Sequence, residues 1–131
     1  MSRRGRRPRN RGGEGQAAVE LALVLPLVAL AVLTVVQVGL LVRDQVLVVH
    51  AAREAAREAA VEPSPEASRR AALTGSGLEA GRLSLDVTGR DGAGSRVRVA
   101  VRYRAPTQVP LVGGALGDVQ LEATATMRVE R

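Results

Sequence analysis

The stretch GEGQAAVELALVLPLVALAVLTVVQVGLLVRDQVLVVHAAREAAREAAVE, residues 13–62, decides the fold of this chain. Between Leu21 and Val42 it carries no charged residue. Such a run of about 22 residues makes roughly 33 Å of helix, which matches the hydrocarbon thickness of a bilayer. The sequence therefore predicts a transmembrane helix over residues 16–42. A buried core helix is the alternative, but a chain of 131 residues has little material to surround one on all sides.

Arginines in front of this run set its expected orientation. Six arginines and the single acid Glu14 precede residue 16, and they account for most of the net charge of +6. After the run, Arg43 and Asp44 cancel. The positive-inside rule then predicts that residues 1–15 are a basic cytoplasmic leader and that the C-terminal part lies outside. A cleaved secretory signal ending near Ala31 is an alternative, although the apolar run would continue well past that cut.

The second half of the stretch predicts an amphipathic continuation of the same helix over residues 43–62. Apolar residues recur there at steps of three and four, the spacing of one helical face, with charged residues between them. We expect one continuous helix from about Gln16 to about Val61, ended by Pro63. The face expected to be buried consists of Val42, Val46, Val49, Ala52, Ala56 and Ala59.

Residues 63–131 predict a small outward-facing α+β domain. A short helix is expected over about residues 66–73, and strands in RLSLDVT (82–88), in RVRVAVRYR (96–104) and over residues 119–130, because apolar and polar residues alternate in each. The expected class is α+β: a long N-terminal helix, with its amphipathic half packed on a three-stranded antiparallel sheet that is wet on the other side. The uncharged segment PLVGGALG, residues 110–117, either contacts membrane or a partner or folds over the end of the sheet.

Composition excludes several function classes. Outside the leader the chain is almost neutral, and it has one Tyr and no Phe or Trp, so we expect no nucleic-acid partner. It has no cysteine, and its only histidine, His50, lacks metal-ligating neighbours in the sequence. Gly75-Ser76-Gly77 and Gly113-Gly114 are interpreted as turn glycines, not phosphate loops. The prediction is therefore a protein without catalytic residues, metal or cofactor.

Several residues inside the apolar run are polar, small or helix-breaking. Pro26 lies near its start, where membrane helices tolerate proline, and we expect a helix kink there. Thr34, Gln37 and Gly39 are of the types that often mark helix contacts in lipid, although they can equally be neutral passengers.

Taken together, the arginine-rich leader, Gly15, QAAVELALVLPL, the helical RDQVLVVHAAREAAR and the final strand ATATMRVE resemble the TadE-like family of tight-adherence pilus-assembly proteins, relatives of type IVb pilins. The combination of glycine, acid and proline over residues 11–60 carries most of the resemblance.

The resemblance implies a role for each residue at the start of the helix. In pilin-like precursors a membrane prepilin peptidase cuts after the glycine, so Gly15 and Gln16 would flank the processing site. Glu20 would then be the fifth residue of the mature chain and would dock against the free N-terminal amine of an adjacent subunit. Alternatively, Glu20 sits at the headgroup level, where a negative charge suits the helix N-terminus.

The sequence departs from that of major Flp-type pilins in two ways that affect the expected function. Major Flp-type pilins carry an aromatic residue after this glutamate, where this chain has Leu21, and they are mostly shorter after the helix. These features favour a membrane-anchored minor pilin or pseudopilin, with the membrane, other pilus or secretion assembly proteins and a prepilin peptidase as partners. The alternative is an unprocessed single-pass membrane anchor whose extracytoplasmic domain binds or scaffolds envelope components.

Overall fold

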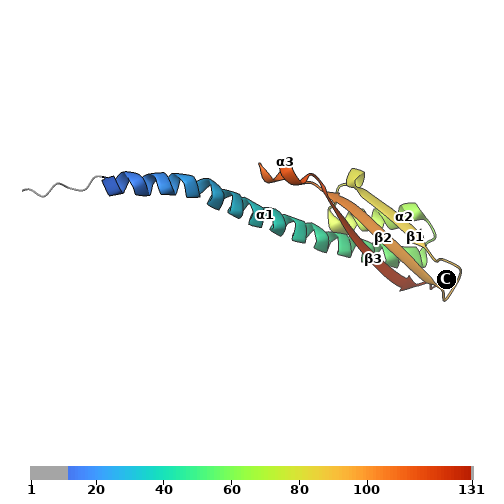
Figure 1. The fold of residues 1–131 in the computed structure, drawn as a ribbon. Coiled ribbons are helices and arrows are strands. Elements are labelled where there is room, and N and C mark those ends of the chain that lie inside the picture. Colours follow the sequence, from blue (N-terminus) through green and yellow to red (C-terminus); the bar gives the residue numbers. More distant parts are fainter. Residues whose placement is uncertain (1–11, 131) are drawn as a thin grey trace, which may run out of the picture.

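The computed structural model describes residues 12–130, which form one long helix with a small α+β domain at its end (Figure 1). The helices are α1 (Gly12–Val61), α2 (Pro65–Ser76) and α3 (Val112–Leu116), and a 3₁₀ turn η1 spans Ala80–Arg82. The strands are β1 (Leu83–Thr88), β2 (Arg96–Ala105) and β3 (Val119–Arg128). The expected α+β class, a long N-terminal helix packed on a three-stranded antiparallel sheet, is confirmed.

Helix α1 is the longest element of the described chain. Its 50 residues correspond to roughly 75 Å of helix. It begins at Gly12, four residues before the predicted start at Gln16, and it ends at Val61, shortly before Pro63. The apolar N-terminal half projects away from the sheet, as Figure 1 shows, while the C-terminal half lies along it.

Three contacts satisfy the carbonyl groups at the C-terminal end of α1, which have no partner within the helix. The guanidinium of Arg90, in the β1–β2 connection, donates to the carbonyl oxygens of Ala59 and Val61. The backbone N–H of Glu130, just after β3, donates to the carbonyl of Ala60 over 3.2 Å. The end of the helix is therefore bound to the β1–β2 connection and to the residue that follows β3, which lie at the same end of the sheet.

The sheet has the order β1-β2-β3 with both pairs antiparallel. In the central strand, Val99 stands opposite Val87 of β1 and Ala125 of β3, so apolar residues share one face. The opposite face is polar: Arg102 forms ion pairs with Asp86 of β1 at 3.0 Å and with Glu122 of β3 at 3.5 Å. The sheet is therefore wet on one side, as the alternation predicted.

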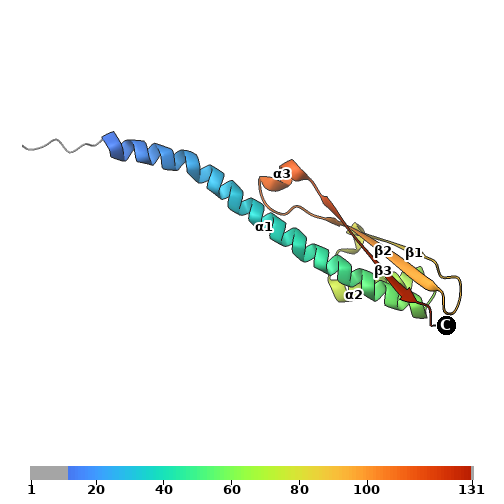
Figure 2. The same ribbon diagram turned by 60° about the horizontal axis from the view of Figure 1, so that its bottom comes forward.

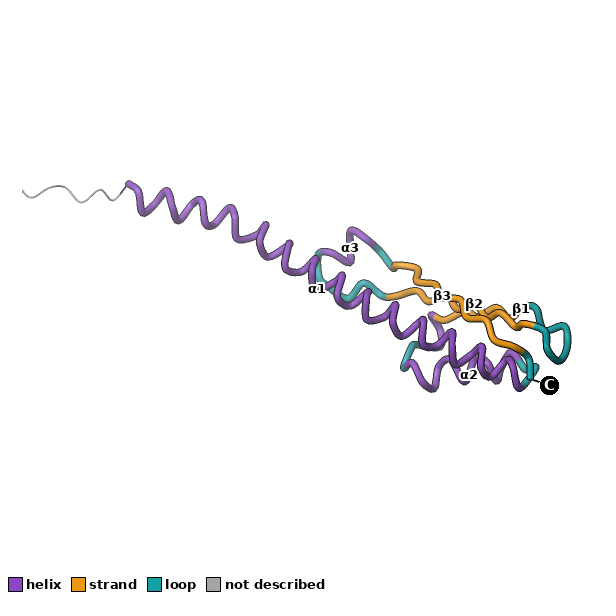
Figure 3. The backbone as a smooth tube through the Cα atoms, turned by 90° about the horizontal axis from the view of Figure 1, so that it is seen from below, coloured by secondary structure: helices purple, strands orange, loops and turns teal. Residues whose placement is uncertain are grey.

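The C-terminal half of α1 lies between the sheet and α2, as Figures 2 and 3 show from two directions. Small residues make this layered packing possible, since six alanines of α1 are 0–5% exposed. The fully buried valines of β2 face them. The buried α1 residues in this half are Val48, Ala51, Ala52, Ala55, Ala56, Ala59 and Ala60.

The predicted buried face of α1 was correct at its alanines and wrong at its first two valines. Val42 and Val46 are 59% and 62% exposed, and Val49 is half-buried. Val48, which the prediction left out, is fully buried. The reason is that α1 is covered on two sides, so its buried arc is wider than a single stripe and includes both alanines of each AA pair.

Helix α2 is longer than the expected range 66–73, and a capping residue marks each of its ends. Ser64 is the N-cap, with its hydroxyl accepting from the N–H of Ala67 over 3.3 Å, and Pro65 is the first helical residue. Gly77 ends the helix in the left-handed conformation, at φ 68°. Both Pro65 and Gly77 thus act as helix boundaries.

The uncharged segment 110–117 contains the five-residue helix α3. It lies beside α1, at the end of the sheet nearer the apolar half (Figure 3). Val109 and Val112 are buried, whereas Leu111 and Leu116 are 78% and 60% exposed.

Candidate processing and docking site

The sequence-predicted site residues lie on the N-terminal turns of α1, far along the helix from the sheet. Gly15, Gln16 and Glu20 are all helical and exposed. Gln16 and Glu20 are four residues apart, so they share one helical face with a rise of roughly 6 Å between them. The arginines of the predicted leader, residues 3–11, lie outside the described residues.

Glu20 is exposed on the N-terminal turns of α1. Within residues 12–130 it takes part in no ion pair or hydrogen bond, and it stands one residue before the charge-free run. A single carboxylate at the edge of an apolar helix is costly to bury without a cation. Its surroundings on the helix, Val19 and Leu21, are large apolar side chains that are 61% and 60% exposed.

Pro26 lies inside α1, six residues after Glu20. Because proline has no N–H, the carbonyl of Ala22 lacks its usual partner one turn earlier. Figure 2 shows α1 curved along its apolar half. The predicted kink at Pro26 stays a prediction.

The apolar half of α1 has the properties of a membrane span. An 18-residue window of the helix reaches a mean hydropathy of 2.6, and none of it is buried by the rest of the chain. A core helix of a soluble fold would be mostly buried, whereas this window is not covered by the described chain. The described residues contain one helix long and apolar enough to cross a bilayer.

Gln37 behaves differently from the other polar residues of the run. It is 1% exposed, and its side-chain oxygen accepts from the N–H of Val109 over 3.3 Å. Thr34 instead donates to the carbonyl of Leu30 in its own helix, and no atom lies within 4 Å of a Cβ built on Gly39. Gln37 therefore marks a contact within the chain, which sequence reasoning could recognise only as a helix-contact residue type.

His50 lies exposed on α1, beside α2. It lines a shallow, open groove with Glu54 and Gly75. In the part of the chain that the structure describes, no three residues of the metal-ligating types lie close enough to hold an ion. The groove therefore supplies no reason to assign catalysis to His50.

A long helix with an exposed apolar half and a small sheet domain at its other end defines a class of protein with one membrane-spanning segment. Within that class, the family model described as TadE-like protein matches residues 15–57, the segment from Gly15 to the amphipathic half of α1. The predicted resemblance is therefore confirmed over this segment. Comparisons with curated proteins and with solved structures gave no match.

The match and the apolar helix together indicate a membrane protein associated with Tad pili and with other pilus assembly components. The family is a structural pilus-assembly family, not an enzymatic one. The matched segment includes Gly15, Gln16, Glu20 and Pro26 but does not itself assign a role to any of them.

Proposed function

We propose that this chain is a minor pilin or pseudopilin, a structural component of a tight-adherence pilus or a related secretion assembly. The observation that carries the proposal is the exposed apolar half of α1, which offers a helix surface and the Glu20 carboxylate to other subunits. The N-terminus lies in the cytoplasm before processing, and the sheet domain faces outward.

Processing by a prepilin peptidase after Gly15 is the first step of this function. Three of the first four residues of α1 are glycine, namely Gly12, Gly13 and Gly15. Each glycine costs a helix about 1 kcal/mol relative to alanine, so this turn unwinds easily. An unwound turn lets the scissile bond between Gly15 and Gln16 enter a peptidase site in an extended conformation.

Docking through Glu20 is the second step. Cleavage removes the leader and creates an amine at Gln16. When two subunits are displaced along the helix axis, the amine of one subunit reaches the Glu20 carboxylate of the other and neutralises its charge. The apolar side chains of the two helices pack together around this ion pair. Glu20 thus sets the axial register between subunits.

One observation favours the second candidate, an unprocessed anchor with an outward binding or scaffolding domain. Helix α1 runs without a break from Gly12 through Gly15, so the scissile bond is helical before any peptidase binds. An anchor would keep this helix and its leader intact.

The N-terminus of the protein recovered from native membranes distinguishes the two candidates. We expect intact-mass measurement and N-terminal sequencing to find a chain that starts at Gln16. A chain that retains its arginines would establish the anchor and remove the basis for docking through Glu20.

A pair of variants tests the docking role of Glu20. Removing one partner of a buried ion pair costs about 2 kcal/mol or more, so Glu20→Ala should lower recovery in cross-linked assemblies by at least about tenfold. Glu14→Ala is the matched control, because processing removes Glu14 and leaves an unchanged mature chain. Equal recovery of both variants would contradict the docking role.

A further inference from the structure

We propose that the uncharged segment around α3, residues 105–117, inserts into the membrane surface and anchors the sheet domain against the lipid beside its own helix. The inference requires the apolar half of α1 to cross the bilayer, but it does not depend on processing or on assembly into a pilus.

Two contacts between the domain and α1 give the depth of this segment. Gln45, three residues after the charge-free run, donates from its side-chain amide to the carbonyl of Glu122 over 3.1 Å, so β3 meets the helix outside the run. Gln37, eight residues earlier, accepts from Val109. Eight residues correspond to roughly 12 Å of helix. The segment at Val109 therefore lies about 12 Å nearer the N-terminus of α1 than the contact made by β3.

The level of Gln37 lies inside the charge-free run. Gln37 lies five positions before Val42, the last residue of the run, which is roughly 7.5 Å of helix. Segments that lie in a membrane interface bury their apolar faces about 5–10 Å into the boundary between headgroups and acyl chains. The contact between Gln37 and Val109 therefore holds the α3 segment at the depth of an interfacial element.

The surface of the segment suits lipid. No residue from Ala105 to Gly117 is charged. Val109 and Val112 are buried, whereas Leu111 and Leu116 are among the most exposed apolar side chains outside the N-terminal half of α1. Leu111 also has a φ of 68° with a ψ of −43°, close to the classic γ-turn, which is rare and strained. Contact with lipid would offset the exposure of both leucines.

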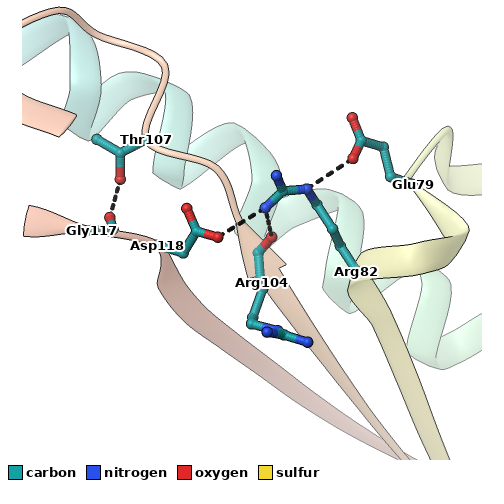
Figure 4. Close-up of polar contacts among 6 residues, drawn as sticks. All are labelled: Glu79, Arg82, Arg104, Thr107, Gly117 and Asp118. Atoms are coloured by element: carbon teal, nitrogen blue, oxygen red, sulfur yellow. Dashed lines mark hydrogen bonds and ion pairs between the residues drawn. The ribbon is translucent and has the colours of Figure 1, made fainter. Parts of the chain in front are cut away.

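The backbone of the segment is also adapted to an environment poor in water, in which unsatisfied polar groups are costly. The N–H groups of Val112, Gly113 and Gly117 donate to carbonyls within the segment over 2.8, 3.0 and 3.1 Å. The Thr107 hydroxyl donates to the carbonyl of Gly117 and closes the loop at its base (Figure 4).

A cluster of charges marks the point where the segment leaves the sheet. Arg82 donates to Asp118 over 3.0 Å, to Glu79 over 2.9 Å and to the carbonyl of Arg104 over 3.4 Å, as Figure 4 shows. The hydrogen bond to Asp118 raises the pKa of the Arg82 guanidinium above its ordinary value, although burial acts in the opposite direction. These charged groups border the uncharged segment and form its polar rim.

Fluorescence quenching tests the insertion directly, because a chain without cysteine accepts a single thiol label at any chosen position. The full-length Leu116→Cys variant is labelled with an environment-sensitive fluorophore and reconstituted in phospholipid vesicles that contain lipids with spin-labelled acyl chains. We expect the emission to shift to the blue and to lose most of its intensity. Circular dichroism checks that the variant is folded.

Two controls separate the possible outcomes. Thr126→Cys, on the polar face of β3, should not be quenched, whereas Val36→Cys, exposed within the apolar run, should be quenched strongly. Quenching at position 36 but not at position 116 would overturn the insertion alone. Loss of quenching at both positions would overturn the membrane span as well. Efficient disulfide formation between two copies at position 116, without quenching, would assign the segment to a protein contact instead.

Discussion

Replacing Val48 by aspartate should unfold the sheet domain while the apolar half of α1 stays helical. Val48 is fully buried where α1 packs in the core of the domain. A charge placed there has no partner, and an uncompensated buried charge costs about 3 to 5 kcal/mol of unfolding free energy. Domains of this size have little stability to spare, so a loss of this amount leaves most molecules unfolded in that region.

The measurement uses Tyr103, the only aromatic residue of the chain and 4% exposed in the core. Its near-ultraviolet circular dichroism in detergent reports the packing of the sheet during thermal unfolding. The matched control is Val46→Asp, the same change two residues earlier at a side chain that is 62% exposed, with an expected effect below about 0.5 kcal/mol. If Val46→Asp destabilised the domain as much as Val48→Asp does, the buried face of α1 would be the one predicted from sequence.

That difference between the two valines also shows what the sequence could and could not predict about the helix. The existence, class and end of α1 followed from periodicity and from Pro63, because these are local properties of the chain. Which side of the helix is buried depends on what covers it. The AAREAAREAA repeat offers two alanines per turn, and only the presence of α2 opposite the sheet explains why both are buried.

The strands were predictable for a similar reason. Their strict alternation predicts one buried and one wet face, and it assigns the apolar residues of β1, β2 and β3 to the buried face. By contrast, α3 is too short to be stable as an isolated helix, and its sequence is rich in glycine. Its position depends on Val109, Val112 and Gln37, which come together only in the folded chain.

The candidate site at the start of α1 differs from α3, because its residues could be selected from the sequence but lie exposed in the described fold. Gly15, Gln16 and Glu20 were selected by a family resemblance, and the fold of one chain leaves them exposed and without partners among the described residues. Their proposed roles involve a peptidase and a neighbouring subunit. Sequence can therefore point to these residues, while the geometry that their proposed roles require involves molecules other than this chain.

Replacing Gly89 by alanine should be the most damaging small change in the loops of the domain. Gly89 has a φ of 83°, a conformation that costs other residues about 1–3 kcal/mol. A Cβ added there would also lie 2.7 Å from the carbonyl oxygen of Arg96, the first residue of β2. Because the contact is with a backbone atom, the main chain itself would have to move to relieve it. We therefore expect a loss of about 2 to 4 kcal/mol in unfolding free energy.

The effect should extend from the turn to the end of the long helix. Gly89 directly precedes Arg90, whose guanidinium caps the carbonyls of Ala59 and Val61. A displaced turn withdraws this cap, so amide hydrogen exchange should accelerate in the last turn of α1 as well as in the β1–β2 connection. A loss of stability without faster exchange in α1 would show that the cap survives and that the strain remains local.

Gly81→Ala supplies the matched control for this experiment. Gly81 lies in η1, just before β1, and Gly89 lies just after β1. At Gly81, however, no atom lies within 4 Å of a Cβ built there, and its φ is not in the left-handed region. Alanine at such a position restricts the unfolded chain, so stability should stay the same or rise by up to about 1 kcal/mol. If Gly81→Ala and Gly89→Ala lowered the melting temperature equally, the strained turn and the close contact with Arg96 would not be what makes glycine necessary at position 89.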